Sequence, residues 1–363
     1  MDRLTVQNNG KPCYEIVFTQ DFSGLADLIS SLGFAERRIA VITDSNVAPL
    51  YLDEVMGAIA SLPGDHCSHT LQAGEEYKQL SSVEGVYETL IRHHLDRHDL
   101  LIALGGGVCG DMTGFAAATY LRGISFLQIP TTLLAQCDSS IGGKTGVDLK
   151  GYKNMVGAFH MPRLVYMNLK TLLSLDDRQF LAGFAEVIKH GMIRDAQYFT
   201  WLLDHRDGIL SRDIGILSQM IRRSCEIKRA VVEEDPTEQG LRAILNFGHT
   251  IGHAVEKFLD FSLYHGECVS LGMAAAAAIS VREGLLAESE GNRIIEGLRS
   301  FGLPVARSFT EEETGRILVL VRSDKKADGK QVRFVYLNGI GNAVRKEISE
   351  ESLRFGILSL SER

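Results

Sequence analysis

The sequence predicts an α/β protein with two domains: an N-terminal domain built on a parallel sheet and a mainly α-helical C-terminal domain. The chain has 363 residues, which is enough for two domains of ordinary size. In the first half, short strand-like runs alternate with stretches of helical spacing, which is typical of parallel β-α-β units with helices on both faces of the sheet. From about residue 174 the strand signals fade and long helical patterns follow.

In the first half, the expected strands are short extended runs, several of which end at a turn signal. The run RIAVIT ends at Asp-Ser-Asn, and the run FLQI is stopped by Pro130. The strands are expected at Tyr14–Thr19, Arg38–Thr43, Cys67–Gln72, Leu100–Leu104 and Phe126–Ile129. Between them, apolar residues recur at helical spacing. The helices are expected at Phe22–Leu32, Pro49–Leu62 and Leu80–His94.

The second half is expected to be mainly helical, with one late extended pair. Its helices are predicted at Gln179–Met192, Ile214–Glu233, Arg242–Phe258 and Glu267–Glu283. The run Val332–Leu337 and its neighbour predict a small hairpin. The change of pattern places the domain boundary at Ser174–Asp177, so that the chain divides into residues 1–176 and 177–363.

Composition argues against several classes of protein. Of the residues, 45% are hydrophobic and 23% are charged, which is ordinary for a globular protein, and the net charge of −8 argues against nucleic acid or an anionic membrane as the main partner. The first residues lack the basic and apolar pattern of a signal peptide, and the apolar stretch MAAAAAIS is too short to span a membrane. Six cysteines without a C-x-x-C pair are expected to be reduced thiols, so we expect a cytoplasmic protein.

A glycine-rich turn follows the strand that ends at Leu104. Gly105, Gly107 and Gly110 form G-x-G-x-x-G, the pattern of a dinucleotide-binding loop, which makes the N-terminal domain Rossmann-like. A helix beginning at Asp111 would offer its first N–H groups to a pyrophosphate. The alternative is a tight strand-to-helix turn that binds nothing.

The acidic residue that usually binds the ribose is missing from its ordinary place. No Asp or Glu lies between Asp111 and Asp138, although one is expected about 20 residues beyond the glycines. Asp44, which follows RIAVIT, is an upstream candidate, because parallel strands end at the same edge of a sheet. A helix cap for the segment from Pro49 onward is the competing interpretation of Asp44.

The stretch DSSIGGKTGVDLKGYKN contains a second candidate anion site. A P-loop is excluded, because its first glycine would fall on Asp138. Lys144, Lys153 and Asn154 remain in a glycine-rich loop, with Arg122 nearby in the sequence. Cations on such a loop suit a phosphate or a carboxylate, whereas the competing interpretation is a solvated surface loop.

Three groups of histidine and carboxylate residues in the second half predict a metal site. They are Glu186 with His190, His249 with His253, and His265 with Glu267. In the first two groups, the i, i+4 spacing places both side chains on one face of a helix. A catalytic zinc ion takes three protein ligands and keeps one open position, so one carboxylate and two imidazoles from three helices would suffice. Spacing alone leaves open whether His249 and His253 both bind the metal or whether one is an acid–base group.

Basic residues accompany these groups. Lys189, Lys228 and Arg242 lie within or beside them, and the run Asp324, Lys325, Lys326 follows near the end of the chain. Each would ordinarily be a solvated surface charge. Lys189 lies three residues after Glu186 on the same helix face, so a salt bridge between the two is the competing interpretation.

Several motifs, in order along the chain, resemble those of the 3-dehydroquinate synthases, a branch of the sugar phosphate cyclases. The resemblance runs from about Asp44 to Lys326 through GGGVCGD, TYLRG, PTTLLAQCDSSIGGKTGVD, KNMVGAFHMP, AEVIKHG, LRAILNFGHTIGHA and HGE. It implies a dehydroquinate synthase-like fold, similar to that of metal-dependent alcohol dehydrogenases, with the active site in the cleft between the two domains. Ala73 and Tyr152 depart from the family's pattern, and neither departure removes a functional group.

The resemblance assigns the glycine loop to NAD and the histidines to Zn²⁺ or Co²⁺. The implied NAD-binding residues are Asp44, Asn46, Glu75, Lys78, Gly105, Gly106, Gly107, Asp111, Thr131, Thr132, Asp138, Lys153, Thr171 and Ser174. The implied metal ligands are Glu186, His249 and His265. His253 is left as an acid–base and hydrogen-bonding group.

The resemblance also implies a substrate, 3-deoxy-D-arabino-heptulosonate 7-phosphate, whose carboxylate and phosphate account for cations in an acidic protein. The implied substrate contacts are Arg122, Lys144, Asn154, Lys189, Lys228, Arg242, Asn246, His253 and Lys325 or Lys326. The implied catalytic residues are Lys144, Lys189, Glu238, Arg242, Asn246 and His253, with Glu238 at a position of proton transfer.

The implied activity is that of a phosphate-eliminating carbon–oxygen lyase of the shikimate pathway of aromatic amino acid biosynthesis. Transient oxidation by NAD, phosphate elimination, reduction, ring opening and an intramolecular aldol step would give 3-dehydroquinate. Because NAD is restored in each cycle, it would be catalytic rather than consumed. The family further implies a homodimer.

Other interpretations remain open at this point. A cyclase of the 2-deoxy-scyllo-inosose synthase type would use the same metal and NAD on a neutral hexose phosphate, whereas Arg122, Lys228, Arg242 and Asn246 favour a carboxylated substrate. A metal-dependent alcohol dehydrogenase would consume NAD and would not need so many phosphate-binding cations. A nucleotide-binding protein without catalytic activity would not need the full set of ligands and cations.

Overall fold

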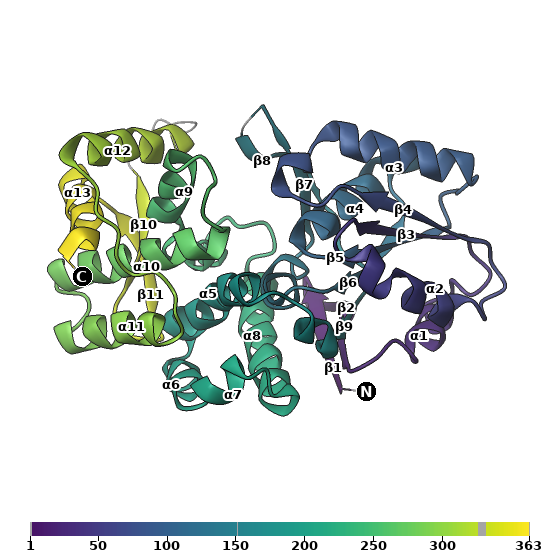
Figure 1. Ribbon diagram of the computed structural model, residues 1–363, viewed down its shortest axis with the longest axis horizontal. Coiled ribbons are helices and arrows are strands. Elements are labelled where there is room, and N and C mark those ends of the chain that lie inside the picture. Colours follow the sequence, from purple (N-terminus) through teal and green to yellow (C-terminus); the bar gives the residue numbers. More distant parts are fainter. Residues whose placement is uncertain (1, 151, 326–331, 363) are drawn as a thin grey trace. The chain divides into compact units, whose positions relative to one another are not determined.

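The chain forms two compact units, Met1–Leu175 and Asp176–Arg363. This computed structural model describes residues 2–150, 152–325 and 332–362, and Figure 1 traces them in the colours of the sequence. The N-terminal unit combines a sheet with helices, and the described part of the C-terminal unit is mainly helical. The predicted fold class is therefore confirmed.

A seven-stranded sheet is the framework of the N-terminal unit. Its strands lie in the order β1-β2-β9-β6-β5-β3-β4. They are β1 (Asp2–Asn8), β2 (Lys11–Thr19), β3 (Ile39–Asp44), β4 (His66–Leu71), β5 (Leu100–Gly105), β6 (Ser125–Pro130) and β9 (Leu164–Asn168). Neighbouring strands are parallel except β1 and β2, which pair antiparallel at one edge. The sequence analysis missed β1, a largely polar edge strand, and β9, which is only five residues long.

Helices cover both faces of this sheet, because successive strand residues point to opposite sides. The helices are α1 (Leu25–Ser31), α2 (Asp53–Ile59), α3 (Leu80–Arg92) and α4 (Gly107–Thr119). On β3, Val41 belongs to the hydrophobic core shared with α1 and α2, whereas the next residue, Ile42, belongs to the core shared with α3 and α4. Figure 1 shows the two helix pairs on either side of the strands.

Two further strands, β7 (Lys144–Leu149) and β8 (Tyr152–Phe159), form an antiparallel hairpin. The expectation of a glycine-rich loop here is wrong. Gly146 lies opposite Gly157, and a Cβ on Gly146 would lie 2.7 Å from the carbonyl oxygen of Val156. These two glycines therefore allow close strand pairing instead of making a mobile loop.

Short helical turns complete the N-terminal unit. They are η1 (Ala48–Leu52), η2 (Glu75–Tyr77), η3 (Tyr120–Arg122), η4 (Ala135–Ser139) and η5 (Leu169–Leu173). The predicted helix Pro49–Leu62 is thus divided, since the π-helical turn η1 precedes α2.

The C-terminal unit is arranged around one buried helix. Its elements are α5 (Asp177–Arg194), α6 (Ala196–Asp204), α7 (Arg206–Leu210), α8 (Ile214–Glu234), η6 (Leu241–Asn246), α9 (His249–Phe258), α10 (His265–Arg282), α11 (Glu288–Ser300), α12 (Glu311–Lys325), β10 (Arg333–Leu337), β11 (Ala343–Glu347), α13 (Glu350–Leu358) and η8 (Ser359–Glu362). Helix α10 packs against α5, α9, α11 and α13. The run from Ala274 to Ala277 is fully buried, because small side chains let the surrounding helices approach. The late hairpin is confirmed by the antiparallel pair β10 and β11.

The predicted helix Arg242–Phe258 is two elements instead of one. The 3-10 helix η6 ends at Asn246, and α9 begins after Gly248. Gly248 has a φ of +82°, a left-handed conformation that interrupts an α-helix and that glycine adopts without strain. The break makes His249 the first residue of α9.

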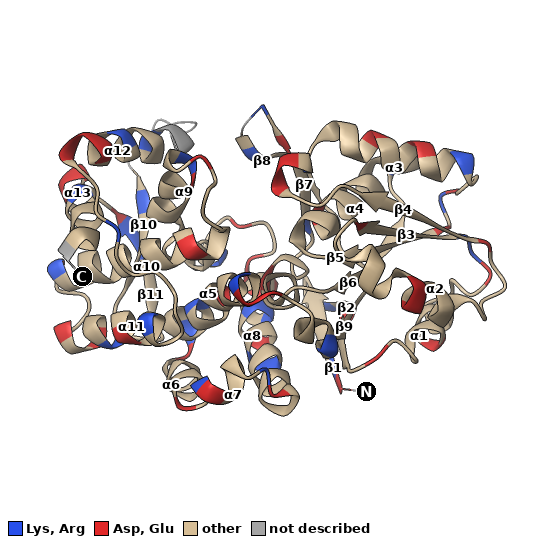
Figure 2. Cartoon of the chain, in the orientation of Figure 1, with Lys and Arg blue, Asp and Glu red and all other residues tan. Residues whose placement is uncertain are grey.

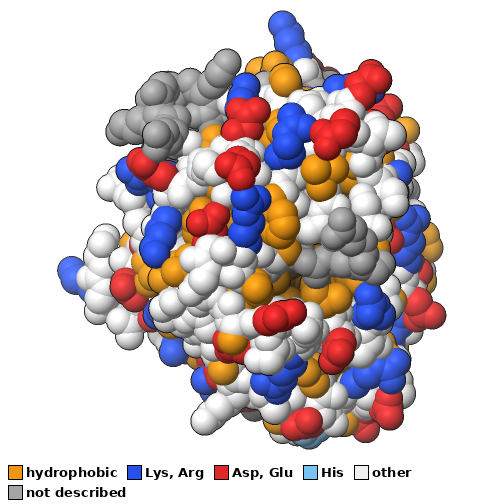
Figure 3. Space-filling model, turned by 90° about the vertical axis from the view of Figure 1, so that its left-hand side faces the viewer, with side chains coloured by type: hydrophobic (Ala, Val, Ile, Leu, Met, Phe, Trp, Pro, Cys, Tyr) orange, Lys and Arg blue, Asp and Glu red, His pale blue; other side chains and the backbone are white. Residues whose placement is uncertain are grey.

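Three further features bear on the environment of the chain. The described residues contain no helix that is both long and apolar enough to cross a membrane. None of the six cysteines, all of which the structure describes, forms a disulfide. Acidic and basic residues occur on elements of both units (Figure 2). On the face drawn in Figure 3, side chains of both charges lie around small hydrophobic patches.

Candidate active site

Three helices of the C-terminal unit bring one carboxylate and two imidazoles together. Glu186 comes from α5, His249 from α9 and His265 from α10. Nε2 of His249 lies 3.5 Å from Oε1 of Glu186, and Nε2 of His265 lies 3.8 Å from the same oxygen. Two ligand atoms on one tetrahedral zinc ion, each about 2.1 Å from it, lie about 3.4 Å apart. The observed spacings therefore suit a metal ion among these three side chains.

Close helix packing brings these side chains together. Helix α10 begins against α5, because a Cβ on Gly266 would lie only 1.8 Å from the carbonyl oxygen of Ala182, one turn before Glu186. Helix α9 packs as closely on α10, since a Cβ on Gly272 would lie 1.9 Å from the carbonyl oxygen of Gly248. Larger side chains at these glycines would push the helices, and with them the three side chains, apart.

The carboxylate of this cluster has one oxygen available to a cation. Glu186 is 1% exposed, and its Oε2 contacts the ammonium group of Lys189. Within the described residues, its buried Oε1 accepts no hydrogen bond. A buried carboxylate oxygen ordinarily has a partner, so this one fits the ligand set of a divalent cation.

The His249 imidazole is in the state that a metal requires. Burial, assisted by the positive charge of Lys189, holds the pKa of His249 well below its usual range, so the ring is neutral at neutral pH. Its Nδ1 lies 3.2 Å from the carbonyl oxygen of Phe247. We assign the ring proton to Nδ1 on this contact, which leaves the lone pair on Nε2, the nitrogen that faces Glu186.

His253 lies beside the same cluster. Its ring centre is 5.0 Å from that of His249 and 5.5 Å from that of His265, and one nitrogen from each of the three rings lies within 4.8 Å of the other two. His253 is exposed, one helical turn after His249 on α9. Both interpretations that the spacing left open are therefore compatible with the geometry.

The other members of the predicted groups have different partners. Nδ1 of His190 shares a 2.7 Å hydrogen bond with the hydroxyl of Ser224 in the core. Glu267 accepts two hydrogen bonds from the guanidinium of Arg178, at 2.7 and 2.8 Å, and a third from the backbone N–H of Tyr264. Helical spacing thus could not distinguish residues that lie together, such as Glu186 and His249, from residues such as His190 that serve the fold.

Three predicted substrate cations of the C-terminal unit are buried. Lys189 on α5, Lys228 on α8 and Arg242 on η6 are 1%, 5% and 2% exposed. These three elements pack against one another, and Figure 2 colours Lys and Arg positions on α5 and α8 blue. Lys189 contacts Glu186, and Arg242 donates a 2.7 Å hydrogen bond to the carbonyl oxygen of Pro236. Buried positive charge of this kind favours an anionic ligand.

The loop between α8 and η6 is organised by Asp235, which the sequence analysis missed. Its carboxylate accepts three hydrogen bonds, 2.7 to 3.0 Å long, from the backbone N–H groups of Gln239, Gly240 and Arg242. Nδ2 of Asn246, the last residue of η6, donates a 2.9 Å hydrogen bond to Oε1 of Glu238 in this loop. Three predicted residues, including Arg242, thus belong to one structured segment. The Asp-Pro pair at the start of the loop was the available sequence signal.

The glycine-rich turn joins β5 to α4 in the N-terminal unit. Helix α4 begins at Gly107, so the expectation of a helix start at Asp111 is wrong. A Cβ on Gly105 would lie 2.7 Å from Cβ of Cys109 and 3.0 Å from Oδ2 of Asp44. The turn therefore requires glycine because side chains approach its backbone closely. The first N–H groups of α4 lie directly at the turn, as anion binding requires.

Asp44 ends β3 next to this turn. Its Oδ1 accepts hydrogen bonds from the backbone N–H groups of Asn46 and Val47, at 2.9 and 3.1 Å, while its Oδ2 is the oxygen nearest Gly105. Burial raises the pKa of Asp44, although the two N–H groups oppose this. The competing interpretation of Asp44 as a helix cap is wrong, because the N-cap residue of η1 is Val47 and no side chain caps this turn. Oδ1 of Asp44 instead holds the turn after β3, and Oδ2 does not take part in these two hydrogen bonds. Asn46 itself is exposed.

Four other predicted residues lie around Lys78, which is 4% exposed. Its Nζ donates hydrogen bonds to Oδ2 of Asp111 at 2.7 Å and to Oδ1 of Asn154 at 2.6 Å. Burial alone would lower the pKa of Lys78, but the carboxylates of Asp111 and Glu75 outweigh burial and raise that pKa. Nζ of Lys153 lies 3.4 Å from Oε1 of Glu75. This ionic group joins η2, α4 and β8.

The predicted hydroxyl residues have two kinds of environment. Oγ1 of Thr131 is buried and has no hydrogen-bond partner among the residues that the structure describes. By contrast, Oγ1 of Thr132 accepts a 3.1 Å hydrogen bond from the N–H of Ala135. The hydroxyls of Thr171 and Ser174 donate to backbone carbonyls at 2.8 and 3.0 Å. The Thr131 hydroxyl thus differs from the other three, which support the local fold.

The remaining predicted residues lie in short helical turns, at the ends of elements, or outside the part of the chain that the structure describes. Arg122 ends η3, is exposed and has a φ of +70°. Lys144 begins β7 and is exposed, and Asp138 lies in η4. Lys325 is the last residue of α12, but its side chain and the whole of Lys326 lie outside the described part of the chain.

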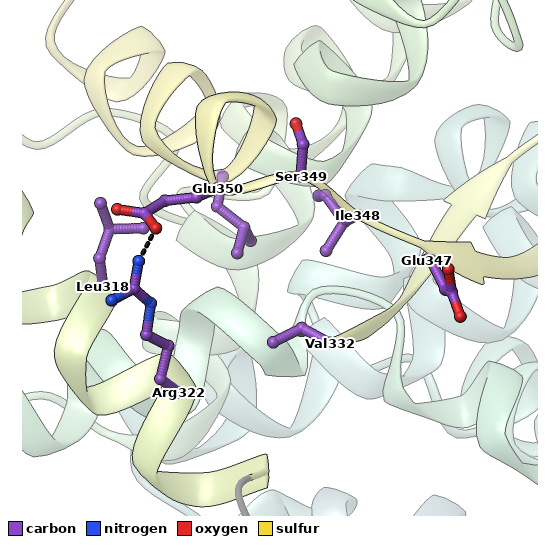
Figure 4. Close-up of a pocket in the computed structure, with 8 residues that line it drawn as sticks. Leu318, Arg322, Val332, Glu347, Ile348, Ser349 and Glu350 are labelled. Atoms are coloured by element: carbon purple, nitrogen blue, oxygen red, sulfur yellow. Dashed lines mark ion pairs between the residues drawn. The ribbon is translucent and has the colours of Figure 1, made fainter. Parts of the chain in front are cut away.

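A separate cavity of about 500 Å³ lies in the C-terminal unit between α12, β11 and α13 (Figure 4). Among its lining side chains, Arg322 and Glu350 form an ion pair with each other, and Leu318 and Ile348 add an apolar wall. Its lining residues include none of those predicted to bind metal, cofactor or substrate. We therefore do not assign this cavity to the candidate site.

Both halves of the chain match family models. A model described as 3-dehydroquinate synthase N-terminal matches residues 68–182, and one described as 3-dehydroquinate synthase C-terminal matches residues 183–327. A curated 3-dehydroquinate synthase of Acidithiobacillus ferrooxidans is 48% identical over 307 residues, which is 84% of each chain. This identity extends across both units.

Solved structures of related cyclases have the same architecture. One is ValA, the 2-epi-5-epi-valiolone synthase of Streptomyces hygroscopicus, with NAD⁺ and Zn²⁺ bound, at a TM-score of 0.89 and 26% identity over 99% of this chain and 100% of that chain. Another is 2-deoxy-scyllo-inosose synthase with carbaglucose-6-phosphate, NAD⁺ and Co²⁺, at a TM-score of 0.90, 26% identity and the same coverage. Together with the family models and the curated relative, these matches show that the chain belongs to the 3-dehydroquinate synthase family of phosphate-eliminating lyases.

Proposed function

We propose that this chain converts 3-deoxy-D-arabino-heptulosonate 7-phosphate to 3-dehydroquinate and phosphate, with NAD and a divalent metal ion as cofactors. The observation that carries the proposal is the buried Oε1 of Glu186, which faces the imidazoles of His249 and His265. Relatives support it: the curated synthase shares 48% identity, and two structurally similar cyclases bind NAD⁺ together with Zn²⁺ or Co²⁺.

The proposed cofactor sites use different parts of the chain. Glu186, His249 and His265 hold the metal and leave one position for the substrate. The N–H groups at the glycine turn hold the pyrophosphate of NAD, and Oδ2 of Asp44 accepts hydrogen bonds from the ribose. When bound, the metal would lower the pKa of a substrate hydroxyl, and NAD⁺ would take up a hydride from that carbon and return it later.

The remaining proposed NAD contacts all belong to the N-terminal unit. Thr131 supports this assignment most directly, since its buried hydroxyl has no partner among the described residues. The ionic group around Lys78 holds α4 and the hairpin together beside the turn. The further proposed contacts are Asn46, Glu75, Lys78, Asp111, Thr132, Asp138, Lys153, Thr171 and Ser174.

The buried cations of the C-terminal unit are proposed to bind the substrate's carboxylate and phosphate. Lys189, Lys228 and Arg242 are nearly inaccessible to water, so their charge is weakly screened and binds an anion strongly. The guanidinium of Arg242 can hold two oxygens at once. Additional proposed contacts are Arg122, Lys144, Asn154, Asn246, His253 and Lys325.

His253 is the proposed acid–base group. It lies beside the two imidazoles of the metal site and is exposed, so a substrate can reach its ring nitrogens. Histidine exchanges protons near neutral pH, which suits both removal of a hydroxyl proton and its return. Glu238, which accepts a hydrogen bond from Asn246, is proposed as a second proton-transfer group. Lys189, Arg242 and Lys144 stabilise the negative charge that develops during elimination.

The first experiment is an assay with purified, zinc-loaded protein, a catalytic amount of NAD⁺ and excess heptulosonate 7-phosphate. Phosphate release is followed with time, and the carbocyclic product is identified by NMR. Many phosphates released per NAD⁺, with 3-dehydroquinate as product, are expected because the hydride is returned in each cycle. NADH accumulating in step with product would contradict the proposal and indicate a dehydrogenase.

Glucose 6-phosphate provides the matched control substrate. It has the phosphate but lacks the carboxylate, so it leaves part of the buried positive charge without an anion. We expect no turnover with it. Turnover of glucose 6-phosphate alone would move the chain to the inosose synthase branch and would contradict the assigned substrate, while leaving the metal and NAD sites intact.

We also propose that the chain works as a homodimer in the cytoplasm. Membership of the family and the absence of disulfides among the six cysteines support this assignment. Sedimentation velocity at micromolar concentration should give about twice the mass of one chain. A mass of one chain across the concentration range would contradict the dimer without affecting the proposed activity.

A further inference from the structure

The two imidazoles proposed as metal ligands face different groups at their second nitrogen. Nδ1 of His249 lies 3.2 Å from the carbonyl oxygen of Phe247, two residues earlier in the chain. Nδ1 of His265 lies 3.6 Å from Oε2 of Glu256. One ring is therefore oriented by the backbone, whereas the other faces a carboxylate that comes from a different helix.

The position of Glu256 is built into the packing of two helices. It lies on α9, seven residues after His249, so it is two turns further along the same face. Helix α9 packs closely on α10, which begins with His265. Glu256 is 3% exposed. A carboxylate is costly to bury so deeply, which indicates that its charge has a use at this place.

We infer that Glu256 is a positioning residue for the metal site and acts through His265. Its carboxylate accepts the Nδ1–H of His265, which keeps the proton on Nδ1, leaves the lone pair on Nε2 and orients the ring toward Glu186. A carboxylate behind an imidazole also makes the other nitrogen a better ligand. The inference rests on the proposed function, because it requires a metal ion at Nε2.

The distance of 3.6 Å is longer than an ordinary hydrogen bond. A cation at Nε2 withdraws electron density from the ring and makes Nδ1–H a stronger donor, so the contact is expected to tighten when metal binds. The competing account is that Glu256 only stabilises the packing of α9 on α10. That role would change the stability of the metal-free protein but would leave its intrinsic affinity for metal unchanged.

The test measures metal affinity separately from stability and activity. The dissociation constant for Zn²⁺ is measured by competition with a chelator in the wild type, E256Q and E256A. Urea denaturation of the metal-free proteins reports stability, and the visible spectrum of the Co²⁺-loaded proteins reports ligand geometry. We expect E256A to bind Zn²⁺ roughly 10- to 100-fold more weakly. The Zn²⁺ affinity of E256Q is expected to lie between those of the wild type and E256A, because its amide oxygen still accepts the Nδ1–H but carries no charge.

E267Q is the matched control. Glu267 lies two residues after His265, but its carboxylate is held by Arg178. The amide keeps an oxygen for the N–H of Tyr264, so the start of α10 is preserved. We expect its Zn²⁺ affinity and its Co²⁺ spectrum to match those of the wild type within about twofold, which would show that loss of a nearby negative charge is not sufficient.

The outcomes separate this inference from the proposed function. Zn²⁺ affinities of E256Q and E256A within twofold of the wild type would overturn the role of Glu256 and leave the metal site in place. If E256A does not fold, E256Q still decides the question, because its side chain has nearly the same shape. A wild type that binds no divalent cation would overturn the metal site and this inference together.

Discussion

The ionic group around Lys78 and the cluster around Glu186 are both deeply buried, yet their charges are balanced differently. Lys78 donates hydrogen bonds to Asp111 and Asn154 at 2.7 and 2.6 Å, so its positive charge is neutralised within the chain. Glu186 contacts Lys189 through one oxygen, while its other oxygen accepts no hydrogen bond from the described residues and faces two imidazole nitrogens.

This difference distinguishes a framework from a binding site. The charge of Lys78 is already balanced within the chain, and its group joins three elements of the N-terminal unit, whatever contacts its members also make with NAD or substrate. The Glu186 cluster is complete only with a cation, because a buried oxygen and a neutral imidazole present lone pairs toward each other. We therefore expect changes in the first group to lower stability in addition to any loss of ligand binding, and changes in the second to affect mainly metal binding and catalysis.

Substitution of His249 should have the largest effect. H249A removes a proposed ligand, so the protein is expected to lose its metal and turnover is expected to fall by roughly 10³-fold or more. Metal content per chain after dialysis and the rate of phosphate release measure the two effects, and circular dichroism shows whether the fold is kept. A folded H249A protein that retains one metal ion per chain would contradict the ligand assignment.

Substitution of His253 should separate metal binding from catalysis. H253A is expected to keep its metal, because three ligands remain, and to lose turnover by about 10²- to 10⁴-fold, because an acid–base group is gone. The same metal analysis and phosphate assay apply. If the H253A protein were metal-free, His253 would be a ligand, and the choice between the two interpretations of α9 would be reversed.

Substitution of Lys78 tests whether the ionic group around it stabilises the N-terminal unit. K78M leaves the carboxylate of Asp111 without its cation in a largely buried place, since that side chain is 20% exposed. The free energy of unfolding is expected to fall by about 3–5 kcal/mol. Urea denaturation measures the loss, and the double variant K78M/D111N should recover most of it. A single variant as stable as the wild type would show that the buried pair does not hold the N-terminal unit together.

Substitution of Asp44 should have the smallest effect, and its sign depends on pH. Burial raises the pKa of Asp44 in the folded protein, so this carboxyl group favours folding while it is protonated and loses that contribution as pH rises through its folded pKa. D44N is therefore expected to be more stable than the wild type at pH 7, and this difference should shrink as pH falls toward about 3.9. Its affinity for NAD should fall by roughly 10-fold, because Oδ2 is replaced by a donor.

Denaturation at several pH values and titration with NAD⁺ measure these two effects. The variant keeps Oδ1, so the hydrogen bonds from Asn46 and Val47 can remain. A D44N protein less stable than the wild type at pH 7 would show that these two bonds need the full negative charge. Unchanged affinity for NAD⁺ would show that Asp44 only holds the turn after β3.

Periodic patterns explain why much of the fold could be predicted from the sequence. The continuous apolar run RIAVIT predicts a buried strand, and the structure has the buried strand β3 there, with helices packed against both of its faces. Predictions failed where a single residue changes the backbone. Gly248 divides one predicted helix into η6 and α9, and the glycines of β7 and β8 allow strand pairing where a loop was expected. The spacing of apolar residues is a property of a whole segment, so it does not reveal a change of backbone conformation at one residue.

The sequence by itself determined the composition of the site: a glycine turn after a strand, histidines at helical spacing, and cations in an acidic chain. Which of these side chains meet was decided by tertiary packing. Glu186 and His265 are distant in the sequence, and they approach because Gly266 lets α10 begin against α5. Glu256 became visible only in the structure, because an ion pair between separate helices depends on distance in space and leaves no period in the sequence.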